Sequence, residues 1–183
     1  VKADSHALDI PSDGALNLTG YWEMTDEMKT TARSLGSIES IFDWVGEYLS
    51  YVKMKERMGA IYAYERKKGD CNEYSDLFIA MNRYFGIPSI LIEGVTTGTG
   101  HAWAASFLDG AWRVMDPLWD IYSLAPSSHV MLAYSKDKTV SNLRMSFYGD
   151  QPEVSHSIKL EFVAPATYPE APLDMLPKLK KAV

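Results

Sequence analysis

The stretch KKGDCNEYSDLF, residues 67 to 78, contains the only cysteine of the chain, Cys71. Asp70 is a favourable helix N-cap, and Glu73 stands three residues after it, as in a capping box. Apolar residues then recur at helical spacing, and a glycine followed by a proline marks the stop. We therefore expect a helix from about residue 71 to 85. Cys71 would lie in its first turn, where the positive end of the helix dipole favours a thiolate.

Length and composition indicate one globular domain over residues 1–183. The chain is 46% hydrophobic and 23% charged, with a formal net charge of −6, which argues against nucleic acid as the main partner. No apolar run approaches the roughly 18 residues of a membrane span. A lone cysteine forms no internal disulfide and indicates no compartment. Because the chain begins at Val1, we read it as processed or trimmed, and whether it is exported stays open, as does its oligomeric state.

The pattern along the chain places helices first and strands afterwards, which is typical of the α+β class. Residues 1–20 are rich in Asp, Ser, Gly and Asn and read as a lead-in. Beyond the cysteine helix, the periodicities predict helices at about 38–54, after an N-cap at Ser37, and at 56–67; strands at 89–95, 101–107, 111–116, 143–147 and 158–162; a flexible loop at 96–100; and a proline-rich surface tail at 165–183.

Asp109-Gly110 is a strong hairpin signal between two of these strands. If these are the two turn residues, Leu108 opposes Ala111, and Trp103 opposes Asp116 further along. His101 then lies on the same face as Asp116, one diagonal step away, which is within reach of two converging side chains. The simplest register therefore predicts that His101 and Asp116 form a pair.

An imidazole held by a carboxylate next to an ionised thiol is the chemistry of a cysteine nucleophile. His101 can accept the proton of Cys71, while Asp116 orients the imidazole and stabilises its charged form. A backbone N–H of the first helical turn would bind the carbonyl oxygen of a substrate. Trp44 and Tyr51, in the preceding helix, are candidates for the second oxyanion donor.

The segments GDCNEYSDLFIAMNRYFGIPSILIEG (69–94), HAW (101–103) and WRVMDP (112–117) resemble the transglutaminase-like core. The resemblance covers about residues 38 to 120. It implies a papain-related core with N-terminal helices packed on an antiparallel β-sheet, and an enzyme that forms a thioester with a glutamine or peptide amide. By the same resemblance, Cys71 is the nucleophile, His101 the general base and Asp116 the orienting carboxylate, and Trp103 or Trp112 is a wall of the site.

Other readings of these residues stay open. Cys71 alone could be a small buried hydrophobe, and Trp103 and Trp112 fit a core better than a substrate platform. We predict no metal and no cofactor, since no four-ligand zinc spacing, calcium loop or nucleotide loop is present, and His6, His129 and His156 are left as surface or unassigned. The domain could also be a non-catalytic binding module. If it is an enzyme on protein or peptide substrates, hydrolysis is favoured slightly over transfer to an amine.

Overall fold

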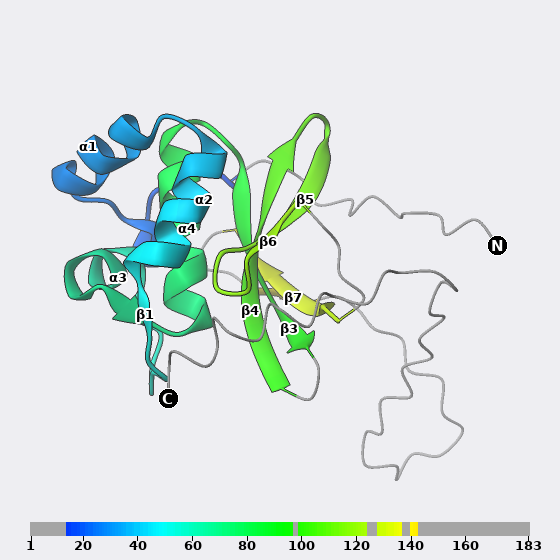
Figure 1. The fold of residues 1–183 in the computed structure, drawn as a ribbon. Coiled ribbons are helices and arrows are strands. Elements are labelled where there is room, and N and C mark those ends of the chain that lie inside the picture. The colour runs from blue at the N-terminus through cyan, green and yellow to red at the C-terminus, as the bar shows by residue number, and fades with distance from the viewer. Residues whose placement is uncertain (1–13, 97–98, 124–127, 137–139, 143–183) are drawn as a thin grey trace, which may run out of the picture.

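The computed structural model describes residues 14–96, 99–123, 128–136 and 140–142 (Figure 1). A 3-10 turn, η1 (Gly20–Trp22), precedes the helices α1 (Asp26–Leu35), α2 (Ile38–Tyr48), α3 (Ala60–Arg66) and α4 (Cys71–Tyr84). Two short strands, β1 (Ser50–Tyr51) and β2 (Lys68–Gly69), pair in parallel among them. The main sheet has the strand order β6-β5-β4-β3-β7-β8, formed by β3 (Ser89–Thr96), β4 (Thr99–Leu108), β5 (Ala111–Asp116), β6 (Ile121–Tyr122), β7 (Val130–Ser135) and β8 (Val140–Asn142). Helices followed by an antiparallel sheet confirm the α+β class.

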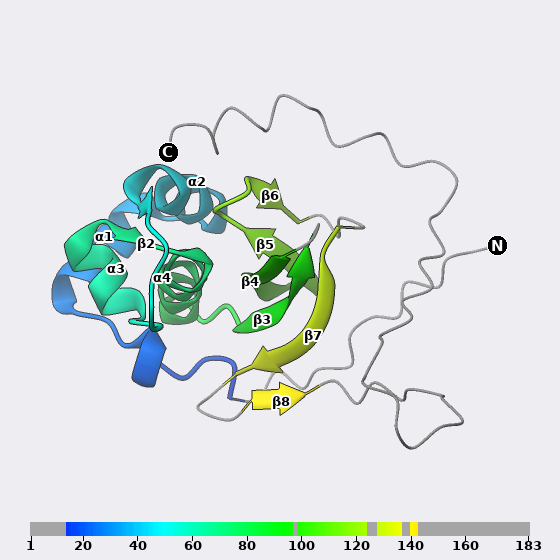
Figure 2. The same cartoon turned by 90° about the horizontal axis from the view of Figure 1, so that it is seen from below.

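Helix α4 lies between the other helices and the sheet (Figure 2). Every residue from Glu73 to Arg83 is buried, because α1, α2 and α3 cover the sides of α4 that do not contact β3 and β4. The alternating residues of β4 show how the sheet packs against α4. Ala102 and Ala104 face the core around α4, whereas Trp103 and Ala105 belong to a second cluster on the opposite face of the sheet. The central helix thus carries its first residue, Cys71, to the ends of the strands.

The start of α4 confirms the capping box. The Asp70 carboxylate accepts a hydrogen bond from the N–H of Asn72 at 3.0 Å, and the Glu73 carboxylate accepts one from the N–H of Asp70 at 3.0 Å. The helix ends at Tyr84, one residue before the predicted end, and Gly86 follows with a φ of 75°. Local sequence therefore determines both ends of this helix.

The helix predicted at 38–54 is shorter than expected. Ser37 is its N-cap, as predicted, but α2 ends at Tyr48, and Leu49 has extended backbone angles. The N–H groups of Ser50 and Val52 bond to the carbonyls of Lys67 and Gly69, each at 2.9 Å. The apolar period runs on past the end of α2, but this strand pairing takes the backbone out of the helix.

Two other helical predictions also need correction. The helix predicted at 56–67 starts later, at Ala60, and ends at Arg66, because Lys67 is left-handed with a φ of 54°. Helix α1 was not predicted, although its N-cap Thr25 and its left-handed C-cap Gly36 are ordinary helix boundaries.

The predicted strands at 89–95, 101–107 and 111–116 correspond to β3, β4 and β5. The loop predicted at 96–100 is shorter, since Thr96 pairs with Thr99 and Gly100 already lies in β4. The strands predicted at 143–147 and 158–162, the tail at 165–183 and most of the lead-in lie outside the described residues. None of the helices in the described part of the chain is long and apolar enough to cross a membrane.

The segment between β1 and α3 is tied to α4 by a buried ion pair. Arg57 donates hydrogen bonds from Nε and one terminal nitrogen to the two carboxylate oxygens of Asp76, at 2.8 and 2.5 Å. The side chain of Asp76 is fully buried. The N–H groups of Met54 and Met58 add bonds to the carboxylates of Asp70 and Glu73. The two carboxylates that cap α4 therefore also anchor this segment beside Cys71.

Replacing Arg57 with leucine is expected to lower the free energy of unfolding by about 3–5 kcal/mol at pH 7.5, because it leaves a buried carboxylate unpaired. Burial raises the pKa of Asp76 to about 6 even with Arg57 lowering it. A raised carboxyl pKa means that stability falls as the pH rises through that value, and without Arg57 the pKa rises further. The loss should therefore be smaller at pH 5, as urea unfolding at both pH values would measure.

The matched control is Arg66→Leu, at an exposed arginine near the end of α3. Its effect should be under about 0.5 kcal/mol. A double variant, Arg57→Leu with Asp76→Leu, should recover most of the lost stability. Equal losses of stability in Arg57→Leu and Arg66→Leu would contradict this account. So would an Arg57→Leu loss that is the same at pH 5 and pH 7.5.

Candidate active site

Cys71 is the first residue of α4 and is partly buried at the edge of the main core. The hydrogen bonds of the cap use the N–H of Asn72 and the N–H of Asp70, and they do not use the N–H of Cys71. The carbonyl of Cys71 accepts a bond from the Ser75 hydroxyl at 2.7 Å, which fixes the first turn. The Cys71 thiol and the backbone N–H of Cys71 therefore both lie at the rigid start of α4.

The hairpin register confirms the predicted pairing of His101 with Asp116. Leu108 opposes Ala111, and the register continues to Ala104 opposite Met115, one step before Trp103 and Asp116. Asp109 and Gly110 have φ values of 51° and 78°, as a type I′ turn requires. His101 Nε2 and Asp116 Oδ2 lie 2.6 Å apart, and both side chains are at least nine-tenths buried.

The carboxylate of Asp116 has four hydrogen-bond donors around it. Oδ1 accepts bonds from the N–H groups of Leu118 and Trp119 at 3.1 and 3.2 Å, and Oδ2 contacts Nε2 of His101 and Nε2 of His129, the latter at 3.2 Å. Burial alone would raise the pKa of Asp116, but the hydrogen bonds and charges of the two histidines outweigh it and lower the pKa. Asp116 is therefore an ionised group that is fixed in place.

His101 links this carboxylate to the cysteine. Burial acts to lower its pKa, but hydrogen bonds with Asp116 and Cys71, together with their charges, raise the pKa of His101 to about 9. The ring is therefore an imidazolium at neutral pH. Since Nε2 faces Asp116, Nδ1 is the nitrogen left for the sulfur. The structure brings the three residues Cys71, His101 and Asp116 together.

This raised pKa gives a direct prediction for the resting protein. Titration of the His101 ring by 15N-edited NMR should give a midpoint near pH 9, with the imidazolium present below that pH and lost as the pH rises through it. In a Cys71→Ala variant the midpoint should fall, because the thiol contributes a hydrogen bond and a charge that raise it. A midpoint near the ordinary 6.5, unchanged by Cys71→Ala, would contradict the proposed contact.

Two tryptophans stack on the ring of His101. The ring centre of Trp119 lies 4.8 Å from that of His101 with planes 27° apart, and the ring centre of Trp103 lies 5.9 Å away with planes 29° apart. Trp103 is 1% exposed, which supports the interpretation of this residue as core and places it beneath the histidine. Trp119 was not singled out from the sequence, although it lies two residues after the Asp116-Pro117 pair.

The two candidates for a second oxyanion donor have different surroundings. Tyr51 lies in β1, is 39% exposed, and has its pKa raised by burial and then by the charges of Cys71 and Asp70. Trp44 instead stacks on Tyr48 with ring centres 4.1 Å apart and lies 6.2 Å from the ring of Tyr64. The role of either residue as an oxyanion donor stays a prediction.

His129 is the residue that sequence reasoning missed. It was left as surface or unassigned, but its side chain is 2% exposed and contacts Asp116. His101, Asp116 and His129 offer ligand atoms within 4.8 Å of one another, so they form a possible metal-binding group. Nothing in the sequence around His129 marks it, because strands that are not adjacent in sequence bring it to Asp116.

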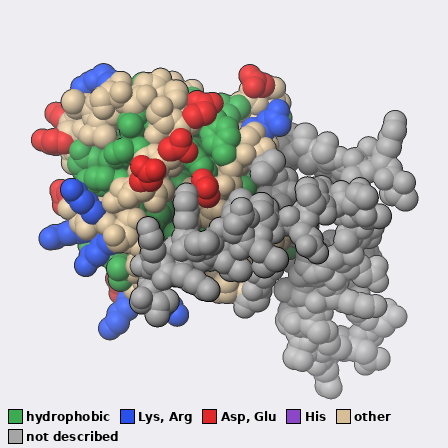
Figure 3. All heavy atoms as spheres, in the orientation of Figure 1, with side chains coloured by type: hydrophobic (Ala, Val, Ile, Leu, Met, Phe, Trp, Pro, Cys, Tyr) green, Lys and Arg blue, Asp and Glu red, His purple; other side chains and the backbone are tan. Residues whose placement is uncertain are grey.

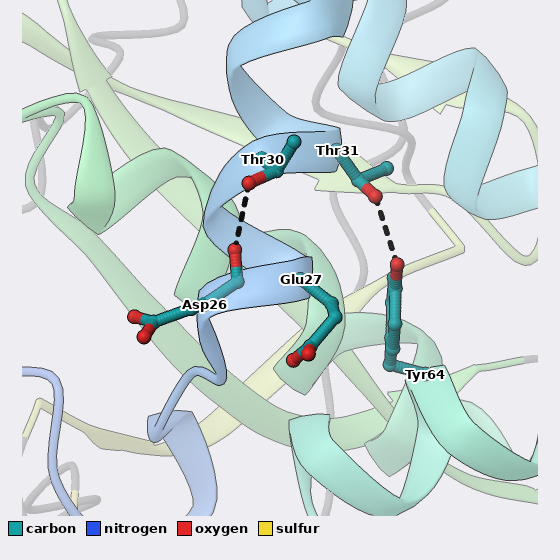
Figure 4. Close-up of a pocket in the computed structure, with 5 residues that line it drawn as sticks. All are labelled: Asp26, Glu27, Thr30, Thr31 and Tyr64. Carbon is teal, nitrogen blue, oxygen red and sulfur yellow. Dashed lines mark hydrogen bonds between the residues drawn. The ribbon is translucent and has the colours of Figure 1, made fainter.

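Two hollows on the described surface do not include the residues His101, Asp116 and His129. One lies between α1 and α3 and is lined by Asp26, Glu27, Thr30, Thr31 and Tyr64 (Figure 4). The Thr31 hydroxyl and the Tyr64 hydroxyl bond there at 2.8 Å, as expected of two packed helices. The other hollow is lined by Phe42, Asp43, Gly46, Glu47, Pro117 and Asp120. Figure 3 shows acidic side chains grouped on one face of the molecule.

Comparison with known proteins identifies the family and the fold of the chain. The model of the transglutaminase-like superfamily matches residues 23–117. Kyphoscoliosis peptidase from Mus musculus is 24% identical in an alignment of 137 residues that covers 64% of this chain and 20% of that protein. The Homo sapiens protein of the same name is 24% identical in an alignment of 131 residues that covers 61% of this chain and 20% of that protein. This chain spans about a fifth of the length of these curated relatives.

A solved structure from Cytophaga hutchinsonii, described as a candidate cysteine protease, superimposes with a TM-score of 0.59 at 18% identity. The match covers 76% of this chain and 59% of that chain, and it shows a shared fold. Since the family model spans more than half of the sequence, the chain belongs to the transglutaminase-like superfamily, whose members are often cysteine-type enzymes.

Proposed function

We propose that this domain is a cysteine-dependent acyl-transfer enzyme that acts on an amide carbonyl, either a glutamine side chain or a peptide bond. The observation that carries the proposal is the chain of contacts from Cys71 through His101 to the buried Asp116. A cysteine next to a histidine that a carboxylate orients is the arrangement of an activated nucleophile. His101 then starts the reaction holding the proton that the leaving group needs.

In the first half of the reaction, the Cys71 sulfur forms a bond to the carbonyl carbon and the carbonyl π electrons move onto the oxygen. The N–H of Cys71, which the helix cap does not use, is the first donor to that oxyanion, and the Tyr51 hydroxyl is the second. Collapse of the intermediate breaks the C–N bond, and His101 transfers its proton to the departing nitrogen. A thioester on Cys71 and a neutral imidazole remain.

In the second half, a nucleophile resolves the thioester. The neutral His101 accepts a proton from water or from an amine as it attacks, and the thiolate leaves. Water gives hydrolysis and an amine gives transfer. The relatives from Mus musculus and Homo sapiens are named as peptidases, which supports hydrolysis of a peptide or side-chain amide as the first outcome to test.

The nucleophile can be tested without knowing the substrate. At pH 7, iodoacetamide should alkylate Cys71 faster in the wild type than in a His101→Ala variant, because a positive imidazolium next to the sulfur favours attack by its anion. A wild-type thiol that behaves as free cysteine would favour a non-catalytic binding module and contradict the proposal.

The reaction products distinguish a peptidase, a deamidase and an amine transferase. The protein is incubated with a glutamine-rich protein such as casein and a labelled primary amine, and ammonia, label and fragments are measured. New fragments indicate a peptidase, ammonia without label a deamidase, and incorporated label an amine transferase. The Cys71→Ala variant is the control for each product, and a product that forms equally with that variant does not come from this site.

The Tyr51 assignment has its own prediction. Tyr51→Phe should lower kcat about 10- to 100-fold with little change in KM, because the hydroxyl would act on the oxyanion and not on the bound ground state. Tyr21→Phe removes the hydroxyl of another exposed tyrosine and should leave kcat within about twofold. Equal rates in wild type and Tyr51→Phe would remove Tyr51 from the site.

A further inference from the structure

His129 lies just before β7 and uses both of its ring nitrogens. Nε2 lies 3.2 Å from Oδ2 of Asp116, and Nδ1 lies 3.1 Å from the Ser128 hydroxyl. The side chain is 2% exposed. The residue also lies beyond residues 23–117, the part of the chain that the family model matches. It is therefore a buried polar side chain at the site to which the proposed reaction gives no role.

The donors around Asp116 determine the proton positions. An ionised carboxylate only accepts hydrogen bonds, so each histidine must present an N–H at Nε2. On the other side of the ring, Nδ1 of His129 pairs with the Ser128 hydroxyl, which can donate or accept. One hydrogen-bond chain thus runs from Ser128 through His129 and Asp116 to His101.

Ring contacts fix His129 in this position. Its ring meets Trp103 edge-on with centres 4.8 Å apart, Trp119 at 5.2 Å and His101 at 5.5 Å. Trp103 and Trp119 are the two rings that stack on His101. His129 therefore packs against all three aromatic rings of the site and limits the movement of each.

The backbone next to His129, at the start of β7, lies very close to β3. The pairing of β3 with β7 shifts between Glu93 and Gly94, so that Leu132 is an extra residue in β7. A Cβ atom on Gly94 would lie 2.1 Å from the carbonyl oxygen of Val130 and 2.6 Å from the ring of Trp103. Only glycine lets the start of β7 approach the sheet this closely, directly beside His129.

From these contacts we propose that His129 is a positioning residue, which holds the Asp116 carboxylate in the orientation that His101 needs. The inference rests on the proposed function for its kinetic consequence, but the contact itself can be tested without turnover. Of the two oxygens of Asp116, the two backbone N–H groups fix Oδ1 only. His129 fixes Oδ2, the oxygen that His101 shares.

A metal ion is the rival occupant, since two imidazoles and a carboxylate are zinc ligands. The spacing favours protons, because His101 Nε2 and Asp116 Oδ2 are 2.6 Å apart. Two ligands at about 2.0 Å from a tetrahedral zinc ion would be about 3.3 Å apart. A bound ion would also require both Nε2 protons to leave.

The experiment compares His129→Leu with His129→Gln. Leucine removes the N–H that faces Asp116, whereas the glutamine amide can replace it. We expect His129→Leu to lower kcat about 10- to 100-fold with KM within about twofold, and His129→Gln to restore kcat to within about threefold of wild type. Equal loss in both variants, or a change in KM alone, would overturn the proposal.

Two further measurements separate this inference from the proposed function. The NMR signal of the His101 Nε2 proton should be sharp and downfield in wild type and His129→Gln, and shifted or broadened in His129→Leu. If no amide substrate is ever turned over, this signal still tests the contact, and an unchanged signal in His129→Leu would overturn it. Calorimetric titration with zinc chloride tests the rival, and one tight zinc site lost in His129→Leu would also overturn the proposal.

Discussion

A Cys71→Ser variant is expected to lose at least about 10⁴-fold in kcat on any amide substrate of this domain. A serine hydroxyl is a far weaker nucleophile than a thiolate unless a base removes its proton during attack. His101 is a poor source of that base, because the hydrogen bond and charge of Asp116 still raise the pKa of the ring in the variant. The arrangement therefore suits sulfur and not oxygen.

The measurement is an initial-rate comparison of wild type, Cys71→Ser and Cys71→Ala at pH 7.5. Serine and alanine should be equally inactive, and both should unfold in urea within about 1 kcal/mol of wild type, since Cys71 is only partly buried. If the serine variant keeps a tenth of the activity, the nucleophile is a different group.

Asp116→Asn is expected to lower kcat about 10³- to 10⁴-fold. Its carboxylate accepts two backbone N–H bonds on Oδ1 and two imidazole N–H bonds on Oδ2. An asparagine has one acceptor oxygen and one NH₂ group, so in either orientation the NH₂ faces other donors. The ring of His101 would lose the charge that raises its pKa and the group that orients it.

Rates and the His101 titration should be measured together. The midpoint of His101 should fall from about 9 in Asp116→Asn, because the lost carboxylate is a cause of the raised pKa. Asp109→Asn is the matched control: the same change at the exposed turn of the same hairpin, where asparagine tolerates the φ of 51°. Comparable losses at both positions would mean that the effect comes from charge or folding and not from the site.

The features that sequence predicted well are local ones. The capping box places the start of α4 because its donors and acceptors lie within three residues. The Asp109-Gly110 turn sets the β4–β5 register, and this register brings His101 to Asp116. Each of these follows from neighbours in the chain, so periodicity and turn chemistry were sufficient.

The features that sequence missed depend on distant pairing. Strand β7 pairs with β3 although three strands intervene in sequence, and this pairing brings His129 to Asp116. The early end of α2 depends on bonds to residues 67–69, which the apolar period cannot show. Tertiary contacts override local propensity at both places.

The order of strands in the main sheet has a practical consequence for shortened versions of the protein. A piece cut to residues 23–117 would keep Cys71, His101 and Asp116 and the full family match. It would lose β7, which covers one side of β3. The exposed row of backbone N–H and C=O groups on β3 could then pair with another molecule. Self-association of such a fragment would follow from its bare sheet edge and would say nothing about the oligomeric state of the whole chain.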